Sequence, residues 1–185
     1  AQLLGLVAEE YAVSASGITY RFYAEFAGAG YHVTSVVGPE AYLNQPPIVI
    51  ETDDPNGFYQ FVFDGVSFDF ADLIQPGFFA SSGFEMLEFD SWFTIGSEPG
   101  ENGSVQNIGI DDALASFNSG GSFSTADSQF GGIWFTTIEA PYLSNADGRV
   151  LLGQLTVGAG YEISIQATIQ WRGEDNVAYQ SQALQ

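Results

Sequence analysis

The stretch ISIQATIQW, residues 163–171, alternates apolar and polar side chains without interruption. Successive side chains of a β-strand point to opposite faces of its sheet. This period of two therefore predicts a strand with one face on a core and the other toward water. The side chains predicted to face the core are those of Ile163, Ile165, Ala167, Ile169 and Trp171.

The same period occurs in ITYRFYAEF, residues 18–26, whose apolar face carries Ile18, Tyr20, Phe22, Ala24 and Phe26. Turn sequences such as DPNG (54–57) separate several further strand candidates. These candidates are residues 6–13, 31–37, 47–52, 58–63, 85–95, 132–138, 149–157 and 177–182. About ten short strands joined by Gly-containing turns predict an all-β fold, an antiparallel β-sandwich of jelly-roll type.

One short surface helix is predicted near residues 111–117, within GIDDALASFNSGG. Asp111 is expected to cap its first free amides, and Leu114 and Phe117 lie three residues apart on one face. Gly120 lies just beyond the expected end, where glycine commonly terminates a helix.

The length of the chain, 185 residues, suits a single domain. No internal repeat or break in composition divides it, so we expect one β-sandwich domain over residues 1–185. Hydrophobic residues make up 45% of the chain, with 16 Phe and 9 Tyr, enough to build a substantial core.

The charge is strongly unbalanced, with 23 acidic residues against three arginines and no lysine, giving a net charge of −20. Such a surface repels nucleic acid and anionic lipid, which bind through Lys and Arg, and it attracts cations. Two interpretations remain open: an acidic coat that keeps the protein soluble in water or salt, and specific loading with metal ions.

Cysteine is absent, which excludes disulfides, thiolate catalysis and zinc-finger spacing. No apolar run is long enough to span a bilayer, so we expect no direct membrane insertion. The chain starts at a small residue, Ala1, without a basic leader. We interpret this as the start of an exported chain after removal of a signal peptide.

The stretch FDSWFTIG, residues 89–96, raises the question of a catalytic site. In a strand, Asp90 and Ser91 point in opposite directions and cannot work as base and nucleophile. Glu88, Asp90 and Trp92 would share one exposed face, an arrangement that suits a sugar platform or a paired-carboxylate hydrolase. A solvent-facing framework strand shows the same pattern, and we favour that interpretation.

Other signatures of catalysis are missing from the sequence. His32 is the single histidine and falls within a strand pattern, and the chain contains no nucleophile elbow, phosphate-binding loop or dinucleotide fingerprint. We therefore expect no enzymatic activity, no catalytic residues and no required cofactor.

Calcium is the one ion for which candidate ligands exist. Two Gly-containing turns crowd carboxylate and amide oxygens, the ligands that Ca²⁺ prefers, although such turns are also common without metal. The candidate ligands are Asp53, Asp54, Asn56, Asn145 and Asp147.

The ordered motifs TYRFYAEF, GFYQ, EFDSWFTIG, GIDDALASFNSGG, GIWFT and DGRVLLGQLTV lie within residues 18–172. In these motifs the chain resembles a group of exported proteins of environmental bacteria, including planctomycetes and marine Bacteroidetes. Members of the group often bear C-terminal sorting signals. The resemblance implies a secreted, extracellular or cell-surface β-rich domain, and it carries over no catalytic residues.

Together these observations predict a non-enzymatic extracellular structural protein, a self-assembling subunit of a surface layer or filament. Its expected partner is another copy of itself. The alternative is a secreted carbohydrate-binding module that stacks a glycan on exposed aromatic residues such as Trp92, Trp134 or Tyr142.

The N-terminal segment AQLLGLV is a candidate for the assembly contact. Its apolar residues lie at a chain end, where domains are usually polar and frayed. Residues 1–8 could form an edge strand of their own sandwich or be exchanged onto the sheet of a neighbouring subunit. The apolar residues in question are Leu3, Leu4, Leu6 and Val7.

Overall fold

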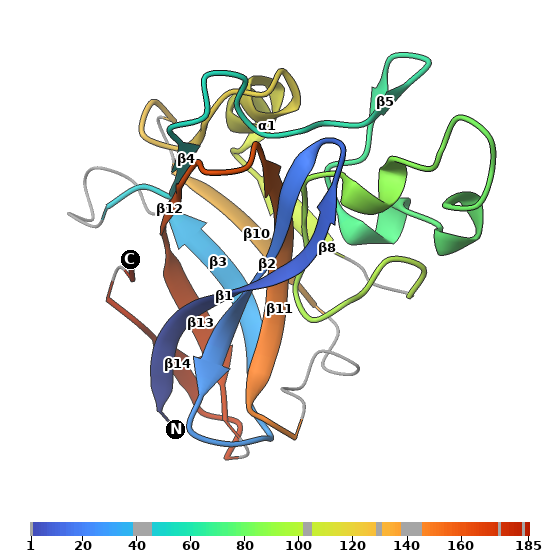
Figure 1. Ribbon diagram of the computed structural model, residues 1–185. Coiled ribbons are helices and arrows are strands. Elements are labelled where there is room, and N and C mark those ends of the chain that lie inside the picture. Colours follow the sequence, from blue (N-terminus) through green and yellow to red (C-terminus); the bar gives the residue numbers. More distant parts are fainter. Residues whose placement is uncertain are drawn as a thin grey trace.

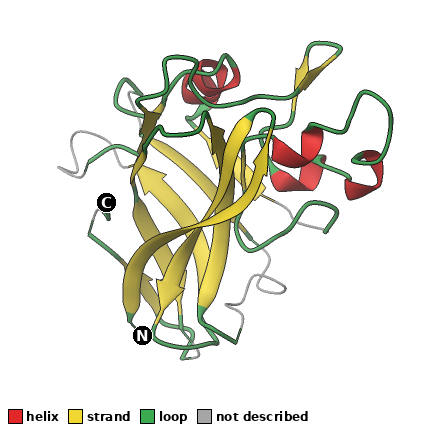
Figure 2. Cartoon of the chain, viewed as in Figure 1, coloured by secondary structure: helices red, strands yellow, loops and turns green. Residues whose placement is uncertain are grey.

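The protein is an antiparallel β-sandwich with one α-helix among its described residues, as the sequence predicts (Figures 1 and 2). The computed structural model describes residues 2–38, 46–101, 105–128, 131–137, 146–173, 175–182 and 184–185.

The first sheet contains four strands in the order β1 (Leu3–Ser14), β2 (Gly17–Phe26), β11 (Arg149–Val157) and β7 (Trp92–Phe93). The second contains five, in the order β14 (Ala178–Gln180), β13 (Thr168–Arg172), β3 (His32–Gly38), β10 (Gly132–Thr136) and β8 (Val105–Ile108). A smaller third sheet has the order β12 (Ile163–Gln166), β4 (Val49–Thr52) and β9 (Phe123–Ser124). The strands β5 (Val62–Phe63) and β6 (Val66–Ser67) form a separate hairpin.

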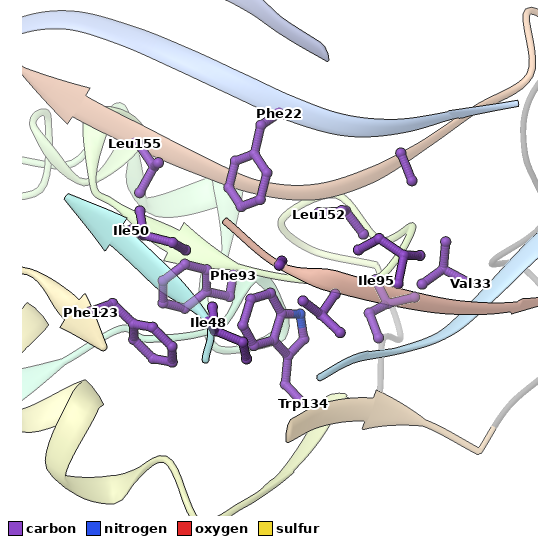
Figure 3. Packing of buried hydrophobic residues seen from close by; sticks show 14 of the residues in the cluster. Phe22, Val33, Ile48, Ile50, Phe93, Ile95, Phe123, Trp134, Leu152 and Leu155 are labelled. Atoms are coloured by element: carbon purple, nitrogen blue, oxygen red, sulfur yellow. The ribbon is translucent and has the colours of Figure 1, made fainter. Parts of the chain in front are cut away.

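The main hydrophobic core lies between these sheets and draws side chains from all three (Figure 3). The ring of Phe93 stacks on that of Trp134 with centroids 5.0 Å apart, and Phe123 meets Trp134 edge to face at 5.9 Å. The Trp134 Nε1 donates a hydrogen bond to the Thr94 carbonyl at 3.2 Å, so the buried indole leaves no donor unpaired.

The stretch ISIQATIQW packs all of its predicted apolar face against this core, as expected. The run is divided, however: β12 ends at Gln166 and β13 begins at Thr168. Ala167 lies between them and forms a bridge with Leu184. At this residue the chain passes from the third sheet to the second, so one alternating sequence serves two sheets.

The alternation predicted for residues 18–26 is confirmed from Phe22 onward, because Phe22, Ala24 and Phe26 of β2 are buried in the core. It fails at Thr19, which was predicted to face water but is 0% exposed and hydrogen-bonded to Thr156. The strand predicted over residues 149–157 has the predicted bounds.

Two predicted strands are largely wrong. Of residues 58–63 only Val62 and Phe63 are in a strand, and of residues 85–95 only Trp92 and Phe93. Residues 58–91, which we call the lateral segment, leave the sheets and fold as loops, the β5–β6 hairpin and 3₁₀ turns at Ala71–Leu73, Pro76–Phe78 and Leu87–Phe89.

The lateral segment, mostly green in Figure 1, lies on one flank of the sandwich. It forms a second hydrophobic cluster with residues of the first sheet. Leu151 and Tyr23, which take part in this cluster, belong to β11 and β2, and Tyr23 points away from the core face that Phe22 and Ala24 occupy. The segment therefore covers part of the outer face of the first sheet, and this packing replaces the strand pairing that its alternation predicts.

The helix α1 spans Asp111–Asn118 and buries Leu114 and Phe117, as predicted. The predicted cap is wrong, because Asp111 is the first helical residue and the N-cap is Ile110, which forms no side-chain capping bond. Ile110 is 0% exposed, so core packing of this apolar side chain fixes where the helix begins. None of the described helices is long and apolar enough to cross a membrane.

Candidate functional site

The predicted exposed face of Glu88, Asp90 and Trp92 does not exist. Asp90 is 0% and Trp92 1% exposed, and Glu88 follows Leu87 in a 3₁₀ turn. The lateral segment covers this region, so neither a sugar platform nor an open pair of carboxylates forms there.

Asp90 and Ser91 join different parts of the fold, which agrees with a framework role for this stretch. Asp90 Oδ1 accepts hydrogen bonds from the backbone N–H of Phe61 at 2.7 Å and of Ser91 at 2.9 Å. Ser91 Oγ accepts a bond from the N–H of Thr156 at 3.0 Å, and Gln154 Nε2 donates to the Asp90 carbonyl at 2.9 Å. The Asp90 side chain thus links two parts of the lateral segment, and the Ser91 side chain with the Gln154 amide fastens that segment to β11.

The electrostatics of Asp90 are unusual. Burial raises the pKa of its carboxyl to about 8, against the opposing effect of its two backbone donors, and the negative charge of Asp69 adds to the increase. Burial also raises the pKa of Asp69, and a hydrogen bond from the side chain of Asn118 opposes that shift. Asp69 and Asn118 are absent from the sequence-based predictions; the one signal was an aspartate between two phenylalanines in the stretch FDF, residues 68–70.

A pocket of about 380 Å³ lies beside these residues and is lined by Gln60 and Asn118, among others. Its lining also includes the turn that holds Asp54 and Asn56. Gly57 makes this arrangement possible: its φ of 70° favours glycine, and a Cβ there would collide with the Gly120 carbonyl oxygen at the end of α1.

The predicted calcium ligands are only partly brought together. Asp54 Oδ1 accepts the N–H of Asn56 at 2.8 Å and its Oδ2 accepts that of Gly158 at 2.6 Å, whereas Asp53 Oδ1 accepts the N–H of Glu162 at 2.6 Å. The two neighbouring carboxylates thus bind different backbone groups.

The second predicted turn is described only in part. Asp147 lies in an exposed turn, and Asn145 lies outside the described residues. Within the described ranges no three His, Cys, Asp or Glu side chains gather closely enough to hold a metal ion. Calcium binding at these turns stays a prediction.

The predicted aromatic platforms are also wrong where they can be seen. Trp92 and Trp134 are 1% and 0% exposed, and the third tryptophan, Trp171, is 6% exposed. Each packs into a hydrophobic cluster, so none offers a free ring face to a sugar. Tyr142 lies outside the described residues.

The predicted assembly residues Leu3, Leu4, Leu6 and Val7 belong to β1, which pairs with β2 and forms one edge of the first sheet. Leu3 and Leu6 pack against the main core, and Leu4 is 55% exposed. Residues 3–8 thus form an edge strand of their own sandwich here, and exchange with a neighbour stays a prediction.

The lateral segment carries an apolar surface that the sequence analysis did not identify. We call it the lateral apolar surface. Its exposed members have exposed fractions between 49% and 58%: Val62, Phe63, Val66, Leu73 and Phe78.

Aromatic rings hold the lateral apolar surface together. Phe84 lies at the centre, with its ring centroid 4.5 Å from that of Phe63, 5.4 Å from Phe78 and 5.8 Å from Phe61. Phe61 belongs to the buried cluster beneath, so the exposed rings are anchored to the fold through Phe84. The sequence analysis predicted a strand only over residues 58–63 of this surface, and it made no prediction for Val66, Leu73 and Phe78.

Comparison with known proteins gives no relative for this chain: no protein-family model, no curated protein and no solved structure matches it.

Proposed function

We propose that this protein is a non-enzymatic structural protein that works outside the cell and associates with copies of itself through the lateral apolar surface. The observation that carries the proposal is the concentration of half-exposed Val, Leu and Phe side chains within residues 62–78. Contiguous apolar patches on soluble proteins usually mark interaction sites, because their burial against a partner removes apolar area from water.

The charge of the chain narrows the choice of partner. At a net charge of −20, nucleic acid and anionic membranes are repelled, so the surface suits a partner that is recognised by apolar contact. A second copy of the chain repels the first over long distances, but salt screens that repulsion while leaving the apolar contact intact. We therefore expect self-association to strengthen as ionic strength rises.

The edge strand β1 supplies a second feature that supports self-association. Tyr11 of β1 donates a hydrogen bond from its hydroxyl to Glu88 in the lateral segment at 3.1 Å, whereas the exposed Leu4 lies near the other end of the strand. Contact between the lateral apolar surface of one copy and the Leu4 end of another would be head-to-tail, and such contacts extend into filaments unless they close a ring.

The carbohydrate-binding alternative loses the aromatic residues that were named for it, because Trp92 and Trp134 are buried and Tyr142 lies outside the described residues. A sugar platform normally needs an exposed aromatic ring. We therefore do not propose carbohydrate binding as the function.

The proposal is tested by sedimentation velocity of the wild-type protein over a concentration series in high salt. The double variant Phe63→Ser/Phe78→Ser should weaken association by about two to four orders of magnitude, since each buried ring contributes about 1.5–3 kcal/mol. Tyr161→Ser and Val177→Ser are controls, because both side chains are exposed outside the lateral segment.

The controls should associate as the wild type does, and circular dichroism should show that every variant is folded. A wild-type protein that stays monomeric throughout the series, or a double variant that associates normally, contradicts the proposal.

A further inference from the structure

Four side-chain atoms, three in the lateral segment and one at the end of α1, are buried and have no hydrogen-bond partner among the described residues. Buried polar groups are nearly always paired, so each such atom requires an explanation. The four atoms are Gln60 Nε2, Asp69 Oδ1, Asp90 Oδ2 and Asn118 Oδ1.

Several contacts connect the four side chains. Asn118 donates a hydrogen bond to Asp69, and the charge of Asp69 acts on Asp90. Asp90 Oδ1 is fixed by the N–H of Phe61, the neighbour of Gln60, which leaves Oδ2 as its free oxygen. Gln60 and Asn118 line the same pocket. Three of the four residues belong to the lateral segment and the fourth ends α1, and these contacts link them in the fold.

The free atoms are those of a ligand set for a hard cation. Two are carboxylate oxygens and one is an amide oxygen, and the amide of Gln60 can turn about its soft terminal torsion to present oxygen in place of nitrogen. A buried carboxylate is costly unless it is paired, and no arginine is hydrogen-bonded or ion-paired to Asp69 or Asp90 within the described chain.

We propose that Asp69, Asp90 and Asn118 are ligands of a buried divalent cation, with Gln60 as a fourth ligand and the pocket beside α1 as the route of entry. Calcium is the ion that fits best, because it takes carboxylate and amide oxygens in irregular geometry and completes its shell with water. The site has no nitrogen or sulfur ligand of the kind that zinc or copper would require.

This site differs from the calcium turns predicted from the sequence. The carboxylate oxygens of Asp54 are occupied by backbone N–H groups, whereas Asp69 Oδ1 and Asp90 Oδ2 are not. The turn that holds Asp54 and Asn56 instead lines the pocket through which the ion would pass. The negative charge of Asp54 there would raise the local concentration of cations.

The test begins with protein that has been stripped with EDTA and titrated with CaCl₂ by isothermal titration calorimetry. We expect one calcium ion per chain, and a melting temperature that rises more in Ca²⁺ than in Na⁺ at matched ionic strength. Asp69→Asn and Asp90→Asn should each weaken binding by about tenfold or more, since each removes one ligand charge.

Two controls carry the same change of charge. Asp111→Asn alters an exposed residue in the first turn of α1, and Asp53→Asn alters the turn predicted from the sequence. Both should bind calcium as the wild type does. Should either variant of the buried pair fail to fold, Asn118→Ala provides a further substitution at a neutral ligand, and it should also weaken binding.

Asp90→Asn gives a second readout in EDTA. The Asn oxygen can still accept the N–H of Phe61, and the neutral amide places no charge beside Asp69, so the metal-free variant should melt at a higher temperature than the metal-free wild type.

Three results would overturn the proposal. The first is a wild type that binds no calcium by calorimetry, in which case a higher melting point of Asp90→Asn would mean that the two aspartates share a proton. The second is loss of binding in Asp53→Asn with normal binding in Asp69→Asn. The third is a gain in melting temperature that is equal in Ca²⁺, Mg²⁺ and Na⁺, which would be screening alone.

Discussion

Asp90 shows how the environment of a single residue can be misjudged from sequence. Alternation predicted an exposed carboxylate, whereas the side chain is fully buried and holds the lateral segment through the N–H of Phe61. Asp90 and Ser91 do contact different groups, as the sequence analysis required, although a 3₁₀ turn rather than a long strand sets their directions.

At the scale of this residue we predict a dependence of stability on pH in EDTA. The pKa of Asp90 is about 8 in the folded protein, against about 4 in an unfolded chain. The folded state therefore holds a proton that the unfolded state loses, and the stability that this proton provides is complete below about pH 4 and is lost as pH rises toward about 8.

The measurement is urea unfolding at pH 5 and pH 8 for the wild type and Asp90→Asn. The free energy of unfolding of the wild type should fall between these values by on the order of 3 kcal/mol more than that of the variant. Asp69, whose pKa is raised as well, remains in both proteins, so the difference isolates Asp90. Equal changes in the two proteins would contradict the assignment.

Elements with strict alternation were predictable because their pattern matches their burial. The strands β2, β12 and β13 follow from the period of two, whereas β11 was predicted from its apolar run and is buried along nearly its whole length. The lateral segment was not predictable in this way: FYQFVF and EMLEFDSWFTI alternate as well as true strands do, but they pack as turns on the outer face of a sheet. The local sequence pattern is the same whether an apolar face belongs to a strand in a sheet or to turns packed on the outside of a sheet.

The candidate cation site could not be predicted from the sequence for a different reason. Gln60, Asp69, Asp90 and Asn118 have no motif spacing, because the loops of the lateral segment and the end of α1 bring them together only after folding. The sequence analysis placed the candidate calcium ligands in the acidic turns instead, because the residues that carry their oxygens are adjacent in sequence.

The assembly role proposed for the edge strand β1 can be tested separately from its role in folding. Leu4 is 55% exposed, whereas Leu6 in the same strand packs against the main core. Leu6→Ser should lower the free energy of unfolding by about 1.5–3 kcal/mol, and Leu4→Ser should leave it nearly unchanged while weakening self-association.

Chemical denaturation and sedimentation velocity of both variants provide the measurement. Deletion of residues 1–8 extends the test, because a chain that uses this segment for assembly should remain folded and become monomeric. If Leu4→Ser assembles normally, or if the deleted chain unfolds, β1 acts only as an edge strand of its own sandwich and has no part in assembly.

At the scale of the whole molecule, the charge of −20 should make stability depend on salt. Self-repulsion among carboxylates weakens the compact state at low ionic strength, and screening relieves it. The melting temperature should therefore rise from about 10 mM to about 150 mM NaCl, as the screening length falls. Scanning calorimetry in NaCl measures this general effect, and an ionic-strength-matched CaCl₂ series separates specific binding from it.

A melting temperature that does not change with NaCl would mean that the acidic groups lie too far apart to repel one another. Arg149, which pairs with Glu9 and Glu25, is part of the limited positive charge that offsets this repulsion among the described residues.

The division of residues 163–171 at Ala167 has a mechanical consequence. One continuous piece of backbone pairs with β4 on one side of this residue and with β3 on the other. A shearing force that slides the second sheet past the third must therefore stretch this covalent connection and cannot act on hydrogen bonds alone. The backbone at Ala167 is a covalent link between the two sheets. We therefore expect the sandwich to resist sliding at this link more than at its open edges.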